Sequence, residues 1–318
     1  LIPKKKINFK TFIDYNEIDL IINCKIEYFE EAKNPVCYFF SKDKTFKISS
    51  KKLIHSLGAI ETISLLFRSI KKKKFQKVNK KVLGRYFMNH PKIKVGKISK
   101  CKELEEYVTK SYSNYDKFIA LSLPLKIQKK FKLLNSCVKI KNSLEINYKN
   151  DIYRSLKRIN IISIVKNLLK LFVLKLSKNI KFLESKEIYT LVFHLEMEPN
   201  FNNRIYFKNN KLFIDYKLNK NDIKSFKKLY FTIMKYFSKE FRTNDDFFKK
   251  IDFNKPEIDA SHHMGGTRYH SNKSDGFVDR NLKINGLKNT YICSSSIFPT
   301  GGSLSPTATL VALSIKLS

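Results

Sequence analysis

The sequence contains few cysteines and few acidic residues. Its five cysteines are spread over 318 residues without a C-x-x-C motif, so neither a disulfide framework nor a zinc site is indicated. This cysteine usage fits a reducing compartment, and we expect a cytoplasmic protein without a metal site. Aspartate and glutamate number 28 against 63 lysines and arginines, so the formal net charge is +35.

A positive charge of this size can indicate a polyanionic partner, because phosphate neutralisation dominates affinity for nucleic acids. The lysines are scattered, however, and Asn, Ile, Phe and Tyr are enriched beside them, as codon bias in an AT-rich genome would produce. Composition thus favours a genomic bias over nucleic-acid binding. The lysine run Lys71–Lys74 is accordingly expected to be a solvated loop.

Long hydrophobic runs are also missing. The most apolar stretch, Ile161–Leu176, is interrupted by Lys166, Lys170 and Lys175, whereas a membrane-spanning helix needs about 20 mostly apolar residues. We therefore expect an amphipathic helix, either in the core or on a membrane surface. The membrane is the less favoured of these two positions.

Glycine is unevenly distributed along the chain. Six of the nine glycines lie in Asp259–Leu317, whereas Gly96 is the only one in Lys92–Pro256. This middle region alternates lysine-rich helical patterns with strand-like runs, so we expect a separate domain there. A G-x-G-x-x-G motif, with which dinucleotide-binding domains hold a pyrophosphate, does not occur in the sequence.

The glycine-rich C-terminal segment carries a histidine pair. His262 and His263 precede Gly265–Gly266, a spacing that suits an imidazole held beside backbone with positive φ or in close approach to a ligand. A turn at Asn285–Gly286 leads into Asn289–Ile292, which is expected to be a short buried strand.

Serines and a helix follow that strand. Ser294–Ser296 would lie at its C-terminal end, where small hydroxyl residues suit a ligand-binding crevice. Ser305 is predicted as the N-cap and Pro306 as the first residue of a helix, with three leucines of Thr307–Leu317 on one face. The free N–H groups at the start of this helix favour an anionic ligand, such as a phosphate or a reduced flavin.

Strands and one helix are predicted at the beginning of the chain. Leu20–Phe29 and Val36–Ile48, separated by Asn34–Pro35, are expected to be strands of a meander. Lys52–Ser69 is predicted to form a strand, a turn at Gly58 and then a helix.

Further strands and a helix are predicted after the middle region. Leu191–Tyr216 contains three strand-like pieces, joined at Asn200–Asn203 and at Asn209–Asn210, for which antiparallel pairing is expected. Asn221–Phe241 places its apolar residues on one face and is expected to be an amphipathic helix.

The C-terminal segment resembles that of the glucose–methanol–choline (GMC) family of FAD-dependent oxidoreductases. The family pattern is approximately HHMGTTR, NLYVAGSSVFPTGG and NPTLTIVALALRL, and Asp259–Leu317 contains counterparts in the same order. Lys52–Ser69 resembles KVVLAAGAIETPRLLLLS, Val82–Pro91 resembles VGRNFMEHP, and Leu191–Tyr216 resembles EQ-PNPDNRV of the substrate-domain sheet. Lys92–Thr190 matches no motif of the family.

The resemblance implies an α/β fold, α+β overall, with an incomplete Rossmann-like FAD/NAD(P)-binding domain and a substrate domain of antiparallel sheet and helices. Residues 1–70 and 257–318 would form the FAD-binding domain, and residues 71–256 the substrate domain. The lack of G-x-G-x-x-G and the first residue, Leu1, indicate a fragment without its N-terminal FAD-binding segment. That segment would be a partner of this chain, which alone is expected to bind FAD poorly.

The resemblance also implies an oxidoreductase that acts on the CH–OH group of an alcohol or sugar, with FAD accepting the hydride and an unidentified acceptor reoxidising it. His262 aligns with the catalytic histidine, and a neutral imidazole with a pKa of about 6.5 can accept the hydroxyl proton. Ser305 stands where the family usually has Asn or His; it can hydrogen-bond the substrate oxygen but cannot act as a base. The residues expected to contact FAD are Gly58, His263, Gly265, Ser294, Ser295, Pro306 and Thr307.

Two alternative functions stay open. Leu57 and Ser305 depart from the family pattern and, together with the missing segment, would suit a non-catalytic remnant of the same fold. A basic protein that binds nucleic acid or an anionic membrane is the other alternative. His90 and His194 are expected to be structural, and outside its motif the same would be expected of His262.

Overall fold

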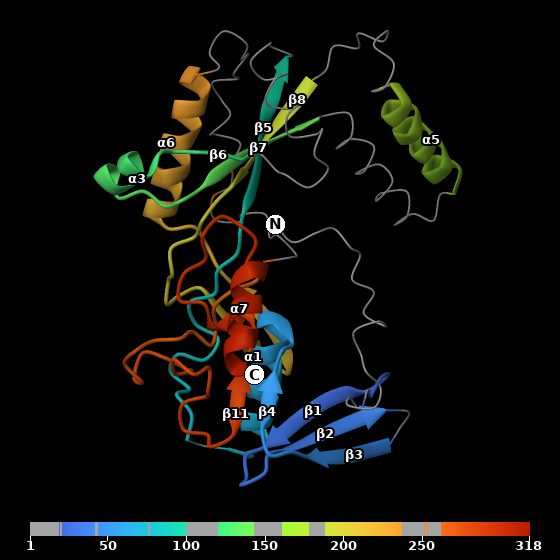
Figure 1. The fold of residues 1–318 in the computed structure, drawn as a ribbon, viewed down its shortest axis with the longest axis vertical. Helices are drawn as coiled ribbons and strands as arrows, with labels where there is room; N and C mark the ends of the chain where they lie inside the picture. The colour runs from blue at the N-terminus through green and yellow to red at the C-terminus, as the bar shows by residue number, and fades with distance from the viewer. Residues whose placement is uncertain are drawn as a thin grey trace.

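The computed structural model describes residues 19, 21–41, 44–75, 77–99, 120–142, 161–177, 188–236, 251, 253 and 262–318. These residues form a mixed α/β structure with antiparallel sheets, one short parallel sheet and helices (Figure 1), which confirms the predicted fold class. Figure 1 shows the elements of residues 25–71 and 290–317 at one end of the long axis, and a four-stranded sheet toward the other end.

The described chain begins with a three-stranded antiparallel meander. Strands β1 (Lys25–Glu30), β2 (Val36–Ser41) and β3 (Lys44–Ser49) pair in that order. The predicted meander is therefore confirmed, with the second apolar run divided into two strands.

Helix α1 (Gly58–Lys71) follows strand β4 (Leu53–His55) and holds the meander in place. Arg68 donates a hydrogen bond of 2.8 Å from Nε to a carbonyl oxygen of β1. The backbone N–H of Phe29 donates to Ser69 Oγ over 3.0 Å. These two polar side chains near the end of α1 therefore fix the helix to the edge strand β1. The strand, glycine turn and helix predicted for Lys52–Ser69 are confirmed.

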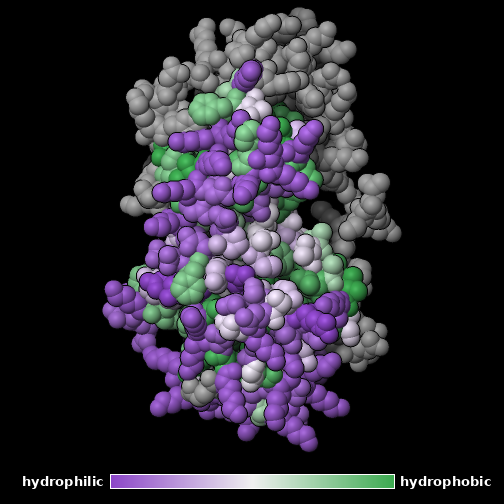
Figure 2. All heavy atoms as spheres, turned by 90° about the vertical axis from the view of Figure 1, so that its left-hand side faces the viewer, coloured by the Kyte–Doolittle hydropathy of each residue, from purple (hydrophilic) through white to green (hydrophobic). Residues whose placement is uncertain are grey.

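In the lysine run Lys71–Lys74, Lys71 is the last residue of α1, and Lys72–Lys74 form the turn after it, so the predicted loop is confirmed from Lys72 onward. Lys74 makes an ion pair with Glu30, and the Lys72 ammonium lies 5.1 Å from the ring centroid of Tyr28. The first three lysines stay exposed, and hydrophilic side chains cover much of the face that Figure 2 shows. The lysines of this run thus face solvent, while Lys72 and Lys74 also contact side chains of β1.

A two-stranded parallel sheet brings together an early and a late segment of the chain. Strand β11 (Thr290–Ile292) lies beside β4, with Thr290 opposite Leu53 and Ile292 opposite His55. The short strand predicted before the serines is confirmed, beginning one residue later than expected. The division into domains at residues 70/71 and 256/257 stays a prediction.

The middle of the chain forms a four-stranded antiparallel sheet. Its strands pair in the order β5 (Lys92–Ser99), β8 (Ile188–His194), β7 (Cys137–Asn142) and β6 (Ala120–Ser122). Helix α6 (Lys220–Tyr236) packs against this sheet and confirms the predicted amphipathic helix as far as it is described. The predicted last turn lies outside the described residues.

Aromatic side chains hold α6 on the sheet. The ring centroids of Phe226 and Tyr230 lie 5.3 and 6.1 Å from that of Phe193 on β8. Leu229 and Ile233 are buried on the same side of the helix. The apolar period of α6 therefore covers the central strand of the sheet.

A hairpin of β9 (Arg204–Lys208) and β10 (Lys211–Asp215) follows the sheet. Its turn residues Asn209 and Asn210 have φ of 50° and 60°, the conformation that two-residue hairpins need. The expectation that β8 would pair with this hairpin is wrong. Leu191–Phe193 of β8 are buried, and a buried central strand needs a neighbour on each edge, which β5 and β7 provide.

Two helices lie at the periphery of the middle region, α3 (Leu125–Phe131) and α5 (Ile161–Ser177). The helical part of the prediction for α5 is confirmed, but its favoured position in the core is wrong, because six of its described apolar side chains are exposed. Among the described residues, no helix combines the length and apolar character that crossing a membrane requires.

The chain ends in the 3-10 helix η3 (Ser295–Ile297) and helix α7 (Thr307–Leu317). Leu310, Leu313 and Leu317 of α7 pack against the hydrophobic core, so the predicted apolar face is confirmed. This packing places the start of α7 beside the polar turns that make up the candidate site.

Candidate active site

Residues 262–268, here called the His loop, run beside the turn-rich residues 82–91, here called the 82–91 loop. Met88 donates a backbone hydrogen bond of 2.8 Å to Met264, and Met264 returns one of 3.0 Å. Both methionine side chains are fully buried. The two loops therefore form one packed unit, although nearly the whole middle region separates them in sequence.

Glycines permit this close approach. Gly265 has a φ of +76°, and a Cβ added there would collide with the carbonyl oxygen of Tyr86. Gly266 has a φ of +96° and accepts a 2.7 Å hydrogen bond from the N–H of Gly84. The expected positive φ after the histidine pair is confirmed, and the close approach at Gly265 is to the backbone of Tyr86.

The two histidines of the pair have different neighbours. The ring of His262 meets that of His90 edge to face, with centroids 5.1 Å apart and planes at 68°. His263 stacks on Phe87 at 6.0 Å, and its carbonyl oxygen accepts a hydrogen bond of 2.6 Å from the Ser295 hydroxyl. The His262 ring thus contacts the fully buried ring of His90, whereas the His263 ring packs on the phenyl ring of Phe87.

The serines after β11 fasten the His loop to the strand end. The hydroxyls of Ser294 and Ser296 lie 2.6 Å apart, and Thr267 donates a 2.6 Å hydrogen bond to Ser296 Oγ. Gly265 N donates to the carbonyl oxygen of Ser295 over 3.1 Å. The predicted position of these serines at the carboxyl end of a strand is confirmed.

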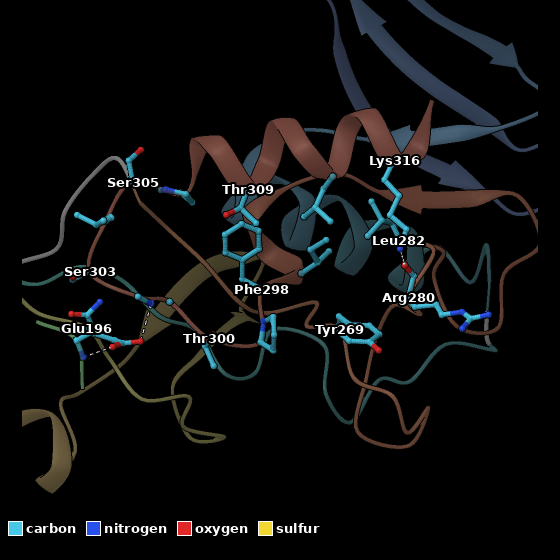
Figure 3. Close-up of a pocket in the computed structure, with 18 of the residues that line it drawn as sticks. Glu196, Tyr269, Arg280, Leu282, Phe298, Thr300, Ser303, Ser305, Thr309 and Lys316 are labelled. Atoms are coloured by element: carbon cyan, nitrogen blue, oxygen red, sulfur yellow. Dashed lines mark hydrogen bonds between the residues drawn. The ribbon is translucent and has the colours of Figure 1, made fainter. Parts of the chain in front are cut away.

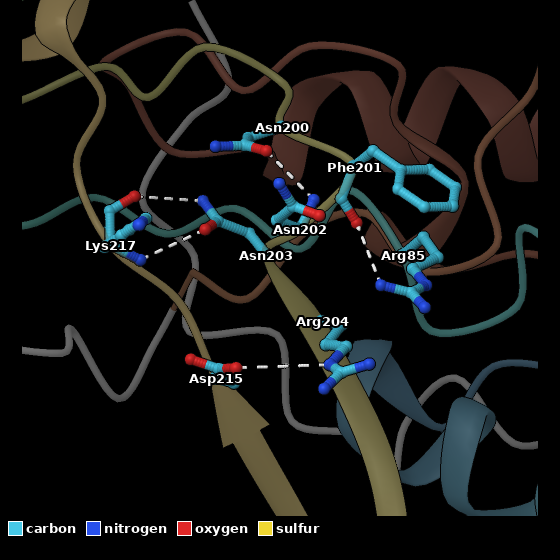
Figure 4. Close-up of polar contacts among 8 residues, drawn as sticks. All are labelled: Arg85, Asn200, Phe201, Asn202, Asn203, Arg204, Asp215 and Lys217. Atoms are coloured by element: carbon cyan, nitrogen blue, oxygen red, sulfur yellow. Dashed lines mark hydrogen bonds and ion pairs between the residues drawn. The ribbon is translucent and has the colours of Figure 1, made fainter.

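The 82–91 loop is held on its other side by the segment before β9 (Figure 4). Phe87 N donates to the carbonyl oxygen of Asn203 over 3.0 Å. The Asn203 side chain in turn bonds both the N–H and the carbonyl of Lys217, at 3.0 and 3.1 Å. The Arg85 guanidinium lies over the Phe201 ring at 4.5 Å. The 82–91 loop therefore rests on the segments that flank the β9–β10 hairpin.

A cleft of about 660 Å³ opens beside α7 (Figure 3). It runs from the turn that precedes the helix to the loop before β11, and both polar and apolar side chains line it. Its lining includes Asn135, Glu196, Tyr269, Arg280, Phe298, Gly301, Gly302, Ser303, Ser305, Pro306, Thr309 and Lys316.

Glu196 joins three segments at one end of this cleft. Its Oε1 accepts a 2.9 Å hydrogen bond from Gly302 N, and its Oε2 accepts one of 2.6 Å from Asn135 N. Its own N–H donates to Ser136 Oγ over 3.1 Å. Sequence reasoning did not single out Glu196, although it stands at the first position of the segment that resembles EQ-PNPDNRV.

Ser305 lies in the cleft but does not cap α7. Its hydroxyl bonds the Thr307 hydroxyl at 2.9 Å, and the helix begins at Thr307 with Pro306 in the N-cap position. The predicted N-cap role of Ser305 is therefore wrong, because its side chain meets a hydroxyl rather than a free backbone N–H. Neither His262 nor His263 is among the residues that line this cleft.

The turn between β4 and α1 contains an open glycine. Gly58 has a φ of +73°, and no atom lies within 4 Å of the place where a Cβ would be. Leu57, just before it, is 41% exposed. Nearby His55 is buried against Phe29, with its Nε2 lacking a hydrogen-bond partner in the described part of the chain. Burial lowers the pKa of His55 to about 4.

The fold is shared with solved flavin-dependent oxidoreductases. A formate oxidase from Aspergillus oryzae RIB40, studied for FAD modification, is 14% identical with a TM-score of 0.58, over 97% of this chain and 61% of its own. A fungal aryl-alcohol oxidase is 13% identical with a TM-score of 0.58, over 97% and 62% of the two chains. An FAD-dependent oxidoreductase from Chaetomium thermophilum is 12% identical with a TM-score of 0.52, over 93% and 60%.

The chain thus spans about three fifths of these structures. Residues 207–314 match the model of the GMC oxidoreductase family, a range that includes the His loop, the serines and most of α7. Residues 207–314 therefore match the family that the sequence motifs indicated. No curated protein matches the sequence.

Proposed function

We propose that the chain is part of an FAD-dependent oxidoreductase that oxidises the CH–OH group of a small alcohol or sugar. The observation that carries this proposal is the match of residues 207–314 to the GMC family, which covers the His loop and most of the residues that line the cleft. One of the structural neighbours is named as an aryl-alcohol oxidase, which supports an alcohol substrate. We also propose a cytoplasmic location.

The residues near the parallel sheet fit a flavin nucleotide. Gly58 offers open backbone at the carboxyl end of β4, where parallel sheets of this kind bind nucleotides. Pro306 and Thr307 begin a helix whose N-terminus favours negative charge. We propose these three residues as FAD contacts, together with the His-loop and serine residues His263, Gly265, Ser294 and Ser295. Bound FAD would supply a hydride acceptor.

His262 is proposed as the base. A neutral imidazole can accept the hydroxyl proton of the alcohol while the carbon-bound hydrogen departs as a hydride. The oxidised product is then a carbonyl compound. The edge-to-face contact with buried His90 restrains the His262 ring. Ser305, in the cleft, is proposed to donate a hydrogen bond to the substrate oxygen, without acting as a base.

We propose that a dinucleotide-binding segment with G-x-G-x-x-G completes the cofactor site. In the described part of the chain, β4 and β11 pair with each other and with no further strand of a sheet. Parallel sheets usually have more strands and are covered on both faces. Additional strands beside β4 and β11 would bring the phosphate-binding turn that this sequence lacks.

The experiment compares His262→Ala with His263→Ala in the flavin-loaded protein, by the rate of flavin reduction in single turnover. Loss of a proton-accepting side chain should slow His262→Ala by roughly 10²- to 10⁴-fold. His263→Ala should have a much smaller effect, and Ser305→Asn should keep or raise the rate. A larger loss in His263→Ala would contradict the assignment of the base.

The alternative is a non-catalytic remnant of the same fold. It is favoured by the exposed Leu57 beside the proposed flavin contact Gly58, and by serine at the position of the second catalytic residue. A measurement of FAD uptake by the wild-type protein separates the two proposals. A protein that takes up no FAD in the presence of its dinucleotide-binding segment would be the remnant.

A further inference from the structure

Helix α5 exposes apolar side chains to solvent over its described part. Six of them are between 49% and 83% exposed, and their spacing of one, three or four residues places them on one face of the helix. The six are Ile161, Ile162, Val165, Leu168, Leu169 and Phe172. A contiguous apolar face of this kind on a soluble domain marks a binding surface.

Ser163 and Asn167 lie one turn apart on the other side of α5. Asn167 is 9% exposed and is the buried residue among the α5 side chains that the structure describes. Its side chain donates to Ser163 Oγ over 3.4 Å. A helix that belongs to a hydrophobic core buries its apolar face and exposes its polar residues. The described side chains of α5 have the opposite arrangement.

The charge of α5 indicates what kind of partner its apolar face fits. Its 17 residues include Lys166, Lys170 and Lys175 and no acidic residue. Over residues 154–181 the sequence contains eight lysines and arginines and no aspartate or glutamate. An amphipathic helix with a basic polar side is the form that inserts into lipid head groups, and clusters of four to eight basic residues favour anionic lipids.

We propose that α5 docks on an anionic lipid surface, with its apolar side among the head groups and its axis in the membrane plane. A second copy of the chain is a poorer partner, because pairing two α5 helices would bring two lysine-rich segments together. Nucleic acid is also a poorer partner, since phosphates gain nothing from isoleucine and leucine side chains. The proposal does not depend on the redox function.

The test is co-sedimentation of the protein with vesicles of phosphatidylcholine alone, or of equal parts phosphatidylcholine and phosphatidylglycerol. We expect binding to the anionic vesicles that added salt weakens. The double variant Leu168→Ser/Leu169→Ser should bind roughly 30-fold more weakly, because two half-exposed leucines no longer enter the lipid. Leu125→Ser/Ile315→Ser is the control, because both residues are exposed apolar positions on other helices.

Circular dichroism checks that the variants keep the fold, and Lys166→Glu gives a second test that leaves the apolar face intact. Lys166→Glu should weaken binding to the anionic vesicles and leave binding to the neutral vesicles unchanged. Equal binding of wild type and the leucine variant, equal binding to neutral vesicles, or no binding by wild type would each overturn the proposal. So would a dimer on gel filtration that the leucine variant dissociates, because a second copy would then cover this face.

Discussion

Replacing Glu196 by glutamine tests how the cleft is held together. The Glu196 carboxylate accepts backbone N–H groups from Gly302 and Asn135, at 2.9 and 2.6 Å. A glutamine side chain has one carbonyl oxygen, and its NH₂ group cannot accept the second N–H. Hydrogen bonds to a charged group contribute about 1.5–3 kcal/mol each. Losing one and neutralising the other should therefore lower the free energy of unfolding by roughly 2–3 kcal/mol.

The assay is urea unfolding, combined with hydrogen exchange of the peptide that contains Gly302. Exchange at Gly302 should rise in Glu196→Gln, because its amide loses its acceptor or keeps only a neutral one. Glu27→Gln is the matched control, since in the described part of the chain the hydrogen bond at Glu27 is to its backbone carbonyl and not to its side chain. An unfolding free energy within about 0.5 kcal/mol of wild type, the range of ordinary surface changes, would refute this reasoning.

Two further changes test the interior around the site. Below about pH 6.5, the ordinary pKa of histidine, the His55 imidazole takes up a proton in the unfolded chain but stays neutral while it is buried. The free energy of unfolding should therefore fall as the pH is lowered from 6.5 to about 4, the pKa of His55 in the folded protein. Relative to His55→Leu, wild type should lose roughly 3 kcal/mol over this window; parallel pH profiles of the two proteins in urea unfolding would contradict this. Gly84→Ala should destabilise more than Gly58→Ala, because an added Cβ collides with the Ile205 carbonyl at Gly84 but meets open space at Gly58; equal melting temperatures would show that backbone conformation alone decides the cost.

Local patterns predicted much of the structure. The strand, glycine turn and helix of residues 52–69, the amphipathic α6 and the leucine face of α7 follow from apolar periodicity and turn chemistry. The positive φ of Gly265 follows from the spacing of a histidine pair and two glycines. Each of these features depends on residues that are close in sequence.

Features that depend on distant partners were predicted less well. The sequence of β8 does not distinguish a hairpin neighbour from β5 and β7, because its apolar pattern only requires burial. The apolar period of α5 fits a core helix as well as an exposed one. Glu196 was missed because its two acceptor roles exist only when Asn135 and Gly302 come together.

The central claim is that this fold binds FAD once its dinucleotide-binding segment is present. The most direct measurement is equilibrium titration of FAD into residues 1–318, alone and together with a G-x-G-x-x-G segment from the same gene. We predict weak binding by the chain alone and stoichiometric binding, with the visible absorbance of oxidised flavin, when the segment is added. Tight binding by residues 1–318 alone would contradict the need for that segment, and absence of binding in both samples would contradict the claim itself.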